Sequence, residues 1–210
     1  MPPLLLIDLL LASAALAMAL ALRPWRALGA DGPPWPWLAW GAVLPLLWGA
    51  DRYAAMPIVQ PLSGAAFLVL CAGWPLAMLV LLPVAAVTAG LGGLGWADGL
   101  HRAVWLGVMP GTLALGLGTL LRRWLPNHLF VYILGRGFFV TLLAATMAGA
   151  GALLLRPPPV GTAVEDLLLA RALAASGEAF ITGMLAAIFV AFRPQWLATY
   201  SDRLYLHPLQ

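Results

Sequence analysis

Long apolar segments, separated by short polar stretches, occupy most of this 210-residue chain and constrain what it can fold into. A helix needs about 20 apolar residues to cross the hydrocarbon core of a membrane, which is about 30 Å thick. Measured against that length, the chain contains seven candidate spans: Leu4–Leu22, Pro36–Ala50, Ile58–Gly73, Leu76–Leu94, Ala103–Leu121, Leu129–Leu155 and Leu167–Phe192. The pattern predicts an all-α integral membrane protein, a single bundle of about seven transmembrane helices that forms one domain over residues 1–210.

The composition is typical of a protein whose solvent is lipid. Hydrophobic residues make up 63% of the chain and charged residues only 9%, whereas a soluble domain has about 25% charged residues. A water-soluble protein of this size would need far more polar side chains to cover its surface. The net charge of +3 comes from scattered single arginines and not from a basic stripe, so we expect the lipid bilayer as a partner and no nucleic acid.

Two of the candidate spans are short for a membrane-crossing helix. Pro36–Ala50 and Ile58–Gly73 are separated by the connection Asp51–Pro57, and either of them could be tilted, broken or partly re-entrant. The last two spans are long enough to tilt strongly or to extend beyond the bilayer. Most of the ten tryptophans flank the candidate spans. Because indole rings favour the headgroup zone, this placement supports the predicted boundaries.

The arginines predict an orientation, because cytoplasmic loops of membrane proteins carry an excess of basic residues. With seven spans and an outer N-terminus, the inner side collects Arg23, Arg26, Arg122, Arg123, Arg193 and Arg203. The outer side then has Arg52, Arg102, Arg156 and Arg171. We therefore expect the N-terminus outside and the C-terminus in the cytoplasm.

Ionisable side chains inside the apolar segments are candidates for function, since they are costly in a membrane and usually face inward. Glu178 lies well inside the last span, and Arg136 lies within the sixth. A structural ion pair between Arg136 and Glu178 would lower the cost of burying both charges. That pair and a role in handling a substrate are equally consistent with the sequence.

A second polar group precedes the fifth span. Asp98 and His101 are three residues apart, which places them on one face of a helix. A carboxylate and an imidazole could bind a divalent metal, but two ligands do not make a metal site. Capping of the fifth helix by Asp98 is the simpler interpretation. Asp51 could cap a loop or pair with Arg52.

Signatures of common enzyme classes are absent from the sequence. The chain has no Walker-type phosphate loop, no His-x-x-x-His or Cys-x-x-Cys pair and no Gly-x-Ser-x-Gly elbow. The chemistry that depends on those motifs is therefore not expected. Three histidines, widely separated along the chain, do not predict a haem or a multi-histidine metal centre. We expect neither enzyme activity nor a cofactor.

Three short stretches follow one another in the order found in a known family. They are Gln60–Gly64, the glycine-rich Gly93–Gly95 followed by Val108–Gly111, and Gly177–Thr182. They resemble the His-Pro-Thr-Gly segment, the glycine-rich turn with its following helix, and the Ala-Glu-Gly-Ile-Leu-Thr pattern of the CbiM-like membrane component of energy-coupling factor (cobalt/nickel-type) ABC transporters. The resemblance covers roughly residues 60–192 and implies a helical transporter subunit in the cytoplasmic (inner) membrane of a bacterium.

The metal ligands of that family are missing from this chain. The family supplies a terminal amine and an imidazole from a Met-His N-terminus and a further histidine from the His-Pro-Thr-Gly segment, whereas this chain has Met1-Pro2 and Gln60. A glutamine side chain binds late transition metals poorly. We therefore expect weak cobalt and nickel binding, and the sequence leaves open whether any metal is bound.

Taken together, the residues and the resemblance predict a permease-like, substrate-specific membrane subunit. It would import a small solute or a metal cation with a separate ATPase and a coupling membrane subunit. The residues that we expect to contact the substrate are Asp51, Gln60, Asp98, His101 and Glu178. The alternative is a non-transport accessory or scaffold subunit of another membrane complex. The missing metal ligands favour this alternative, and the intramembrane charges of Glu178 and Arg136 favour transport.

Overall fold

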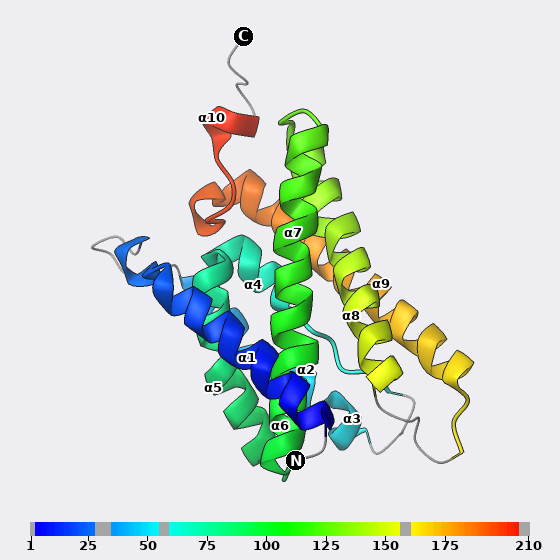
Figure 1. Ribbon diagram of the computed structural model, residues 1–210. Helices are drawn as coiled ribbons and strands as arrows, with labels where there is room; N and C mark the ends of the chain where they lie inside the picture. The colour runs from blue at the N-terminus through cyan, green and yellow to red at the C-terminus, as the bar shows by residue number, and fades with distance from the viewer. Residues whose placement is uncertain (1–2, 28–34, 55–58, 156–160, 206–210) are drawn as a thin grey trace.

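The computed structural model describes residues 3–27, 35–54, 59–155 and 161–205, and all regular structure in these ranges is helical (Figure 1). Among these described residues, five helices are long and apolar enough to cross a membrane: α1 (Pro3–Ala21), α5 (Trp74–Leu91), the continuous helix Trp96–Trp124, the continuous helix Val131–Leu155, and α9 (Val164–Phe192). The prediction of an all-helical fold is confirmed for the described residues, and the apolar helices are compatible with a membrane protein. Met1, Pro2 and Arg156, on which some predictions depend, lie outside the described residues.

The second and third predicted spans are short, as the sequence indicated, and the helix of the third is shorter than predicted. α2 (Trp35–Trp48) has 14 residues and α4 (Ala65–Ala72) has 8, fewer than the about 20 residues of a full membrane crossing. Between them lie the single turn α3 (Ala50–Tyr53) and the non-helical residues 59–64. Figure 1 shows residues 59–64 as a thin cyan trace that leads into α4. Of the predicted span 58–73, residue 58 lies outside the described residues and 59–64 are not helical.

Two residues explain why the helix does not extend backwards from α4. Pro61 has no backbone N–H to donate and its ring would clash with the preceding turn of a helix. Gly64 adopts a left-handed conformation with φ of 64°, which an L-residue with a side chain rarely adopts. We call residues 59–64 the unwound segment. It leaves backbone polar groups inside an apolar bundle, where they must find partners.

Two of the long helices include wider π-helical turns. The first consists of α6 (Trp96–Arg102), the π-helix η2 (Ala103–Val108) and α7 (Met109–Trp124). The second consists of the π-helix η3 (Val131–Phe139) and α8 (Val140–Leu155). Pro110 explains the first π-helix, since it cannot donate to the carbonyl of Leu106 and would clash with it in an α-helix. The N–H of Met109 bonds instead to the carbonyl of Val104, five residues earlier.

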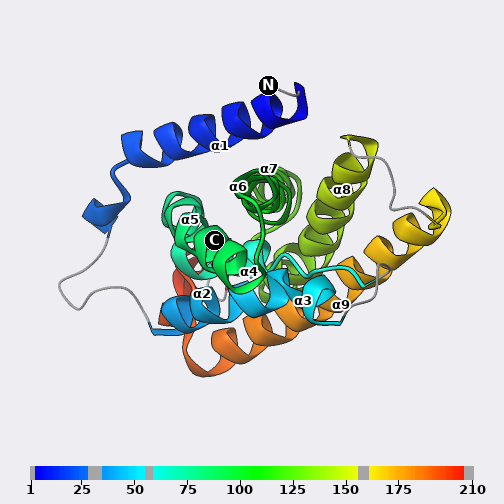
Figure 2. The same ribbon diagram turned by 90° about the horizontal axis from the view of Figure 1, so that it is seen from below.

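The helices pack around α7, which Figure 2 shows almost end-on with α1, α5, α8 and α9 around it. Glycines allow the closest approach between η3 and α9. A Cβ placed on Gly137 would lie 3.2 Å from the Cα of Gly183 and 3.3 Å from the Cβ of Ala186. Small residues at such crossings bring helix backbones together where no hydrophobic effect acts between helices. This crossing fixes α9 against η3 and α8.

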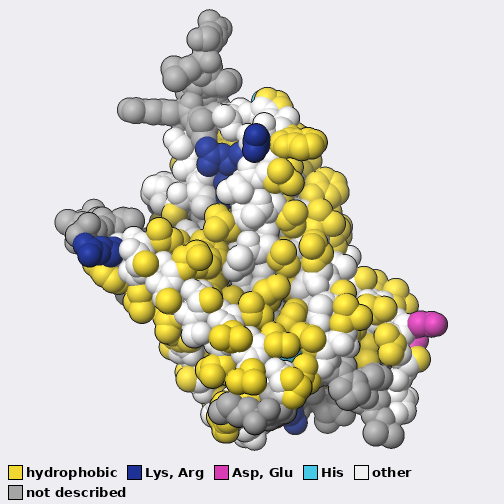
Figure 3. Space-filling view, viewed as in Figure 1, with side chains coloured by type: hydrophobic (Ala, Val, Ile, Leu, Met, Phe, Trp, Pro, Cys, Tyr) yellow, Lys and Arg dark blue, Asp and Glu magenta, His cyan; other side chains and the backbone are white. Residues whose placement is uncertain are grey.

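Apolar side chains dominate the face of the molecule in Figure 3, and basic side chains lie toward its ends. Large apolar residues such as Leu10, Leu154 and Phe180 are exposed on the long helices. So wide an apolar surface is costly in water and is expected in lipid. Trp96 and Trp124 are exposed at opposite ends of one long helix, as expected for tryptophans at the membrane interface.

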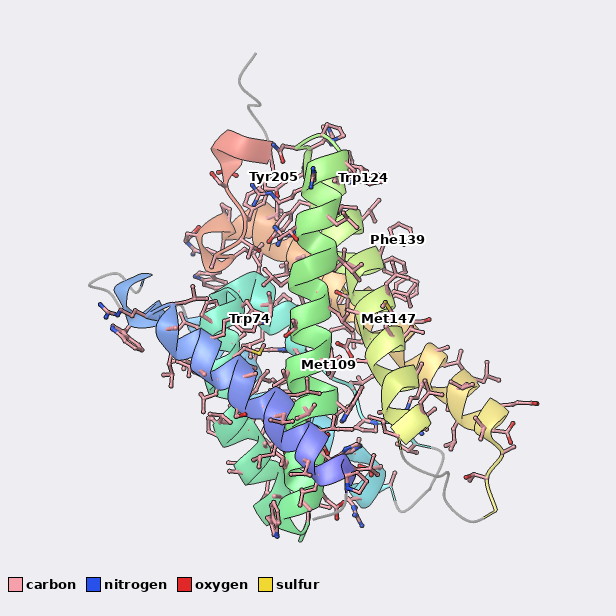
Figure 4. All side chains as sticks on the ribbon, viewed as in Figure 1. Trp74, Met109, Trp124, Phe139, Met147 and Tyr205 are labelled. Atoms are coloured by element: carbon pink, nitrogen blue, oxygen red, sulfur yellow. The ribbon has the colours of Figure 1, made fainter. Side chains whose placement is uncertain are left out.

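The chain folds back onto the bundle after α9. The amide of Ala198 donates to the carbonyl of Cys71 over 3.2 Å, and the amide of Thr199 donates to the carbonyl of Leu70 over 3.3 Å. These bonds satisfy carbonyl groups at the C-terminal end of α4. Leu197 and Tyr205 are buried in the same contact. Figure 4 shows Tyr205 at the same end of the molecule as Trp124.

Candidate functional site

The carboxylate of Glu178 binds the end of the unwound segment. One oxygen accepts the amide N–H of Ser63 over 2.8 Å, and the other accepts the amide N–H of Gly64 over 2.9 Å. Glu178 is buried in α9, with 4% of its surface exposed, as expected for an ionisable residue inside an apolar segment. Since these amides precede α4, the carboxylate also lies where a helix N-terminus favours negative charge.

Two tryptophans of α2 bind the carbonyl groups of the same two residues. The indole N–H of Trp48 donates to the carbonyl of Ser63 over 2.7 Å, and that of Trp40 donates to the carbonyl of Gly64 over 2.8 Å. Both N–H groups and both carbonyls of Ser63 and Gly64 therefore have side-chain partners. Non-helical backbone is tolerated at membrane depth only where it is buried in protein or lines a cavity, and here both conditions hold.

A small cavity lies beside the unwound segment. Its volume of about 20 Å³ is enough for one water molecule. The lining residues come from the unwound segment, η2 and the start of α7, α8 and α9: Gln60, Pro61, Ser63, Trp105, Leu106, Pro110, Ala145, Gly149, Arg171, Ala174, Ala175 and Glu178. Gln60 and Glu178, two of the five predicted substrate contacts, thus line one cavity. Asp51, Asp98 and His101 do not line it.

The predicted ion pair between Arg136 and Glu178 is not formed. Both oxygens of Glu178 bind backbone amides, and among the described residues the ion pairs are His101–Asp8 and Arg102–Asp51. Arg136 is buried in η3, where its guanidinium lies over the ring of Tyr132 at 5.6 Å and reaches the carbonyl of Thr199 at 3.5 Å. Arg136 thus interacts with the segment that follows α9, and the prediction failed because partners across a bundle cannot be read from single residues.

His101 belongs to a polar cluster that the sequence did not predict. Its Nδ1 lies 2.8 Å from the carboxylate of Asp8, which also accepts the indole N–H of Trp105 over 2.9 Å. Asp8 is buried in α1 and ties that helix to α6 and η2. Asp98 lies in the first turn of α6, while Gly95 is the N-cap residue. The one sequence feature that could have indicated this cluster is the charge of Asp8 within an otherwise apolar segment.

Asp51 pairs with Arg102 and not with Arg52. The two guanidinium nitrogens of Arg102 bind the two oxygens of Asp51 at 2.9 and 2.6 Å, a bidentate geometry that fixes both side chains. Arg102 also donates to the carbonyl of Trp48. These contacts connect α3 and the end of α2 to α6. We therefore assign Asp51 a structural role.

No group of three or more His, Cys, Asp or Glu side chains that could hold a metal ion occurs in the described ranges. The predicted Asp98–His101 cluster gains no third ligand there. Its histidine is engaged by Asp8 instead.

Comparisons with known proteins give no evidence on function. No protein-family model, no curated protein and no solved structure matches this chain. The resemblance to the cobalt/nickel transporter components stays a prediction from three short stretches.

Removal of the Asp8 carboxylate should loosen α1. We expect Asp8→Ala to lower the melting temperature of the detergent-solubilised protein, because the Trp105 indole loses its acceptor and the loss of a buried partner costs about 1–3 kcal/mol. Asp8→Asn keeps an acceptor oxygen and should lose less. Ser13→Ala, at an exposed position on the same helix, is the matched control. Equal melting of Asp8→Ala and Ser13→Ala would contradict a stabilising role.

Proposed function

We propose that this chain is the substrate-specific membrane subunit of a transporter that imports a small solute. A separate ATPase and a coupling membrane subunit would supply the energy, because the sequence has no nucleotide-binding motif of its own. The observation that carries the proposal is the unwound segment, whose residues Gln60 and Ser63 line a cavity together with Glu178. Transporters commonly build substrate sites from discontinuous helices and unwound backbone near the middle of the membrane.

The location of the three family-like stretches supports the same proposal. Gln60 and Ser63 come from the first stretch, Pro110 from the second and Glu178 from the third, and all four line one cavity. Stretches that are far apart in the sequence are thus neighbours beside the unwound segment. This is the arrangement expected if they form a common binding site.

A small solute is a better candidate for the substrate than a metal cation. The described residues contain no cluster of three metal-binding side chains. The cavity is lined by Arg171, whose positive charge repels cations. In this proposal the chain lies in the cytoplasmic membrane of a bacterium, crossed by the five long helices of the described residues, with its N-terminus outside and its C-terminus inside.

A non-transport accessory or scaffold subunit is the second candidate. The specific observation in its favour is the size of the cavity, because about 20 Å³ holds one water molecule and not a solute. In that case the unwound segment and Glu178 would serve only to hold α4 in place.

Purification of the affinity-tagged chain from membranes of its native host tests the proposal. An ATPase subunit with a Walker phosphate loop should be recovered in stoichiometric amounts with the wild-type chain, and it should be absent from a parallel purification of an unrelated tagged membrane protein. Recovery of a different membrane complex without any nucleotide-binding subunit would overturn transport and favour the accessory function.

A further inference from the structure

Arg171 presents a positive charge to the cavity beside the unwound segment. It is partly buried in α9, and its Nε is buried without a hydrogen bond. Among the described carboxylates, none forms an ion pair with it. A cation held inside a membrane protein normally pairs with an opposite charge, so the site lacks an anion.

The two carboxylates of this region are already engaged. Asp51 interacts electrostatically with Arg171, but both of its oxygens bind Arg102. Glu178 lines the same cavity, but both of its oxygens accept backbone amides. Neither carboxylate can turn to Arg171 without breaking contacts that it already makes. A negatively charged partner for Arg171 would therefore have to come from outside the described residues.

The fold makes room for the arginine at this position. A Cβ placed on Gly149 would lie 2.9 Å from the Cδ of Arg171, closer than two carbon atoms can approach. Glycine in α8 thus accommodates the stem of the arginine, which lines the cavity together with Gln60. A guanidinium donates hydrogen bonds in a planar fork that matches carboxylate and phosphate groups.

We infer that Arg171 binds a small oxyanion, of the carboxylate or phosphate class, in the cavity beside the unwound segment. The cavity volume of about 20 Å³ admits about one water-sized atom, so one oxygen of the oxyanion enters it and the rest of the group lies outside. The inference rests on the proposed function where it assigns this anion to the transported solute. Binding itself needs only this chain. The oxyanion has two possible sources, the transported solute and the headgroup of an anionic lipid, which carries the same chemistry.

Calorimetric titration tests the inference on the full chain in an uncharged detergent. The probes are sodium acetate and sodium phosphate, with sodium chloride at equal ionic strength as the reference. We expect acetate or phosphate to bind the wild type and Arg171→Gln to weaken that binding by about tenfold or more, since a charged hydrogen-bonding partner is lost. Arg122→Gln removes an exposed arginine from the last turn of α7 and should bind like the wild type.

A second variant keeps the test valid if Arg171→Gln does not fold. Ala174→Leu retains the charge of Arg171 and fills the cavity that Ala174 lines, so it should also weaken acetate or phosphate binding.

To separate a soluble anion from a lipid headgroup, the melting temperature is compared in nanodiscs of phosphatidylcholine with and without phosphatidylglycerol. Stabilisation by phosphatidylglycerol alone, lost in Arg171→Gln, would retain the oxyanion site and assign it to lipid.

The inference is overturned if neither probe nor anionic lipid acts on the wild type, or if folded Arg171→Gln responds as the wild type does. Because the titration uses no other subunit, it separates this inference from the proposed function. Anion binding without any ATPase partner would refute transport and keep the site. An ATPase partner without anion binding would keep transport and refute the site.

Discussion

Replacement of Glu178 by alanine should destabilise the protein strongly, and by more than replacement of Asp8 does. The variant leaves the amides of Ser63 and Gly64 without their acceptors. Since each buried unsatisfied group costs about 1–3 kcal/mol, we expect a loss of about 2–6 kcal/mol. The measurement is the melting temperature of the purified protein in one detergent, together with the yield of monodisperse protein.

Two variants make this result interpretable. Glu178→Gln keeps one acceptor oxygen but turns an NH₂ group toward the other amide, so an intermediate loss is expected. Glu165→Ala removes an exposed carboxylate from the first turn of the same helix and should have little effect. If Glu178→Ala melted at the temperature of Glu165→Ala, the carboxylate would not hold the unwound segment.

Substitution of Gly64 by alanine should have the second largest effect. Its φ of 64° costs an L-residue about 1–2 kcal/mol. The added Cβ would also lie 2.4 Å from the Cδ2 of Leu44, and overpacking of this kind costs about 1–3 kcal/mol. We therefore expect a marked fall in the melting temperature under the same conditions.

The two contributions can be measured separately. Gly93 has a φ of 57° with no neighbour within 4 Å of an added Cβ, so Gly93→Ala should show the backbone strain alone. The double variant Gly64→Ala with Leu44→Ala should lose less than the sum of the single losses, because Leu44 no longer overlaps the new methyl group. Strict additivity of the two changes would contradict the close contact.

The all-helical fold was predictable from the lengths of the apolar segments, because that signal depends only on local composition. The break before α4 was predictable only in part. The sequence indicated that this span was short, but not that two indoles and a carboxylate would satisfy its backbone. Trp40 and Trp48 illustrate the reason. A tryptophan favours the headgroup zone and also donates a hydrogen bond inside a bundle, and composition does not distinguish the two.

The site was predicted in the same partial way. Gln60 and Glu178 were found because each is polar inside an apolar segment, and they do line one cavity. Asp8 carries the same signal, but its contacts with His101 and Trp105 depend on residues more than 90 positions away. The count of arginines treated Arg171 as an outer-side residue, although it lies inside the predicted span Leu167–Phe192. In the structure Arg171 lies in the second turn of α9, which begins at Val164.

The attachment of α4 at both of its ends determines which parts of the bundle can move independently. Glu178 of α9 holds the amides that precede α4, and Ala198 and Thr199, just beyond α9, hold the carbonyls at its other end. A hinge between α4 and α9 would break both sets of bonds at once. Motion of α4 relative to α9 is therefore opposed at both ends of α4, and the indole bonds of Trp40 and Trp48 to Gly64 and Ser63 extend the same constraint to α2.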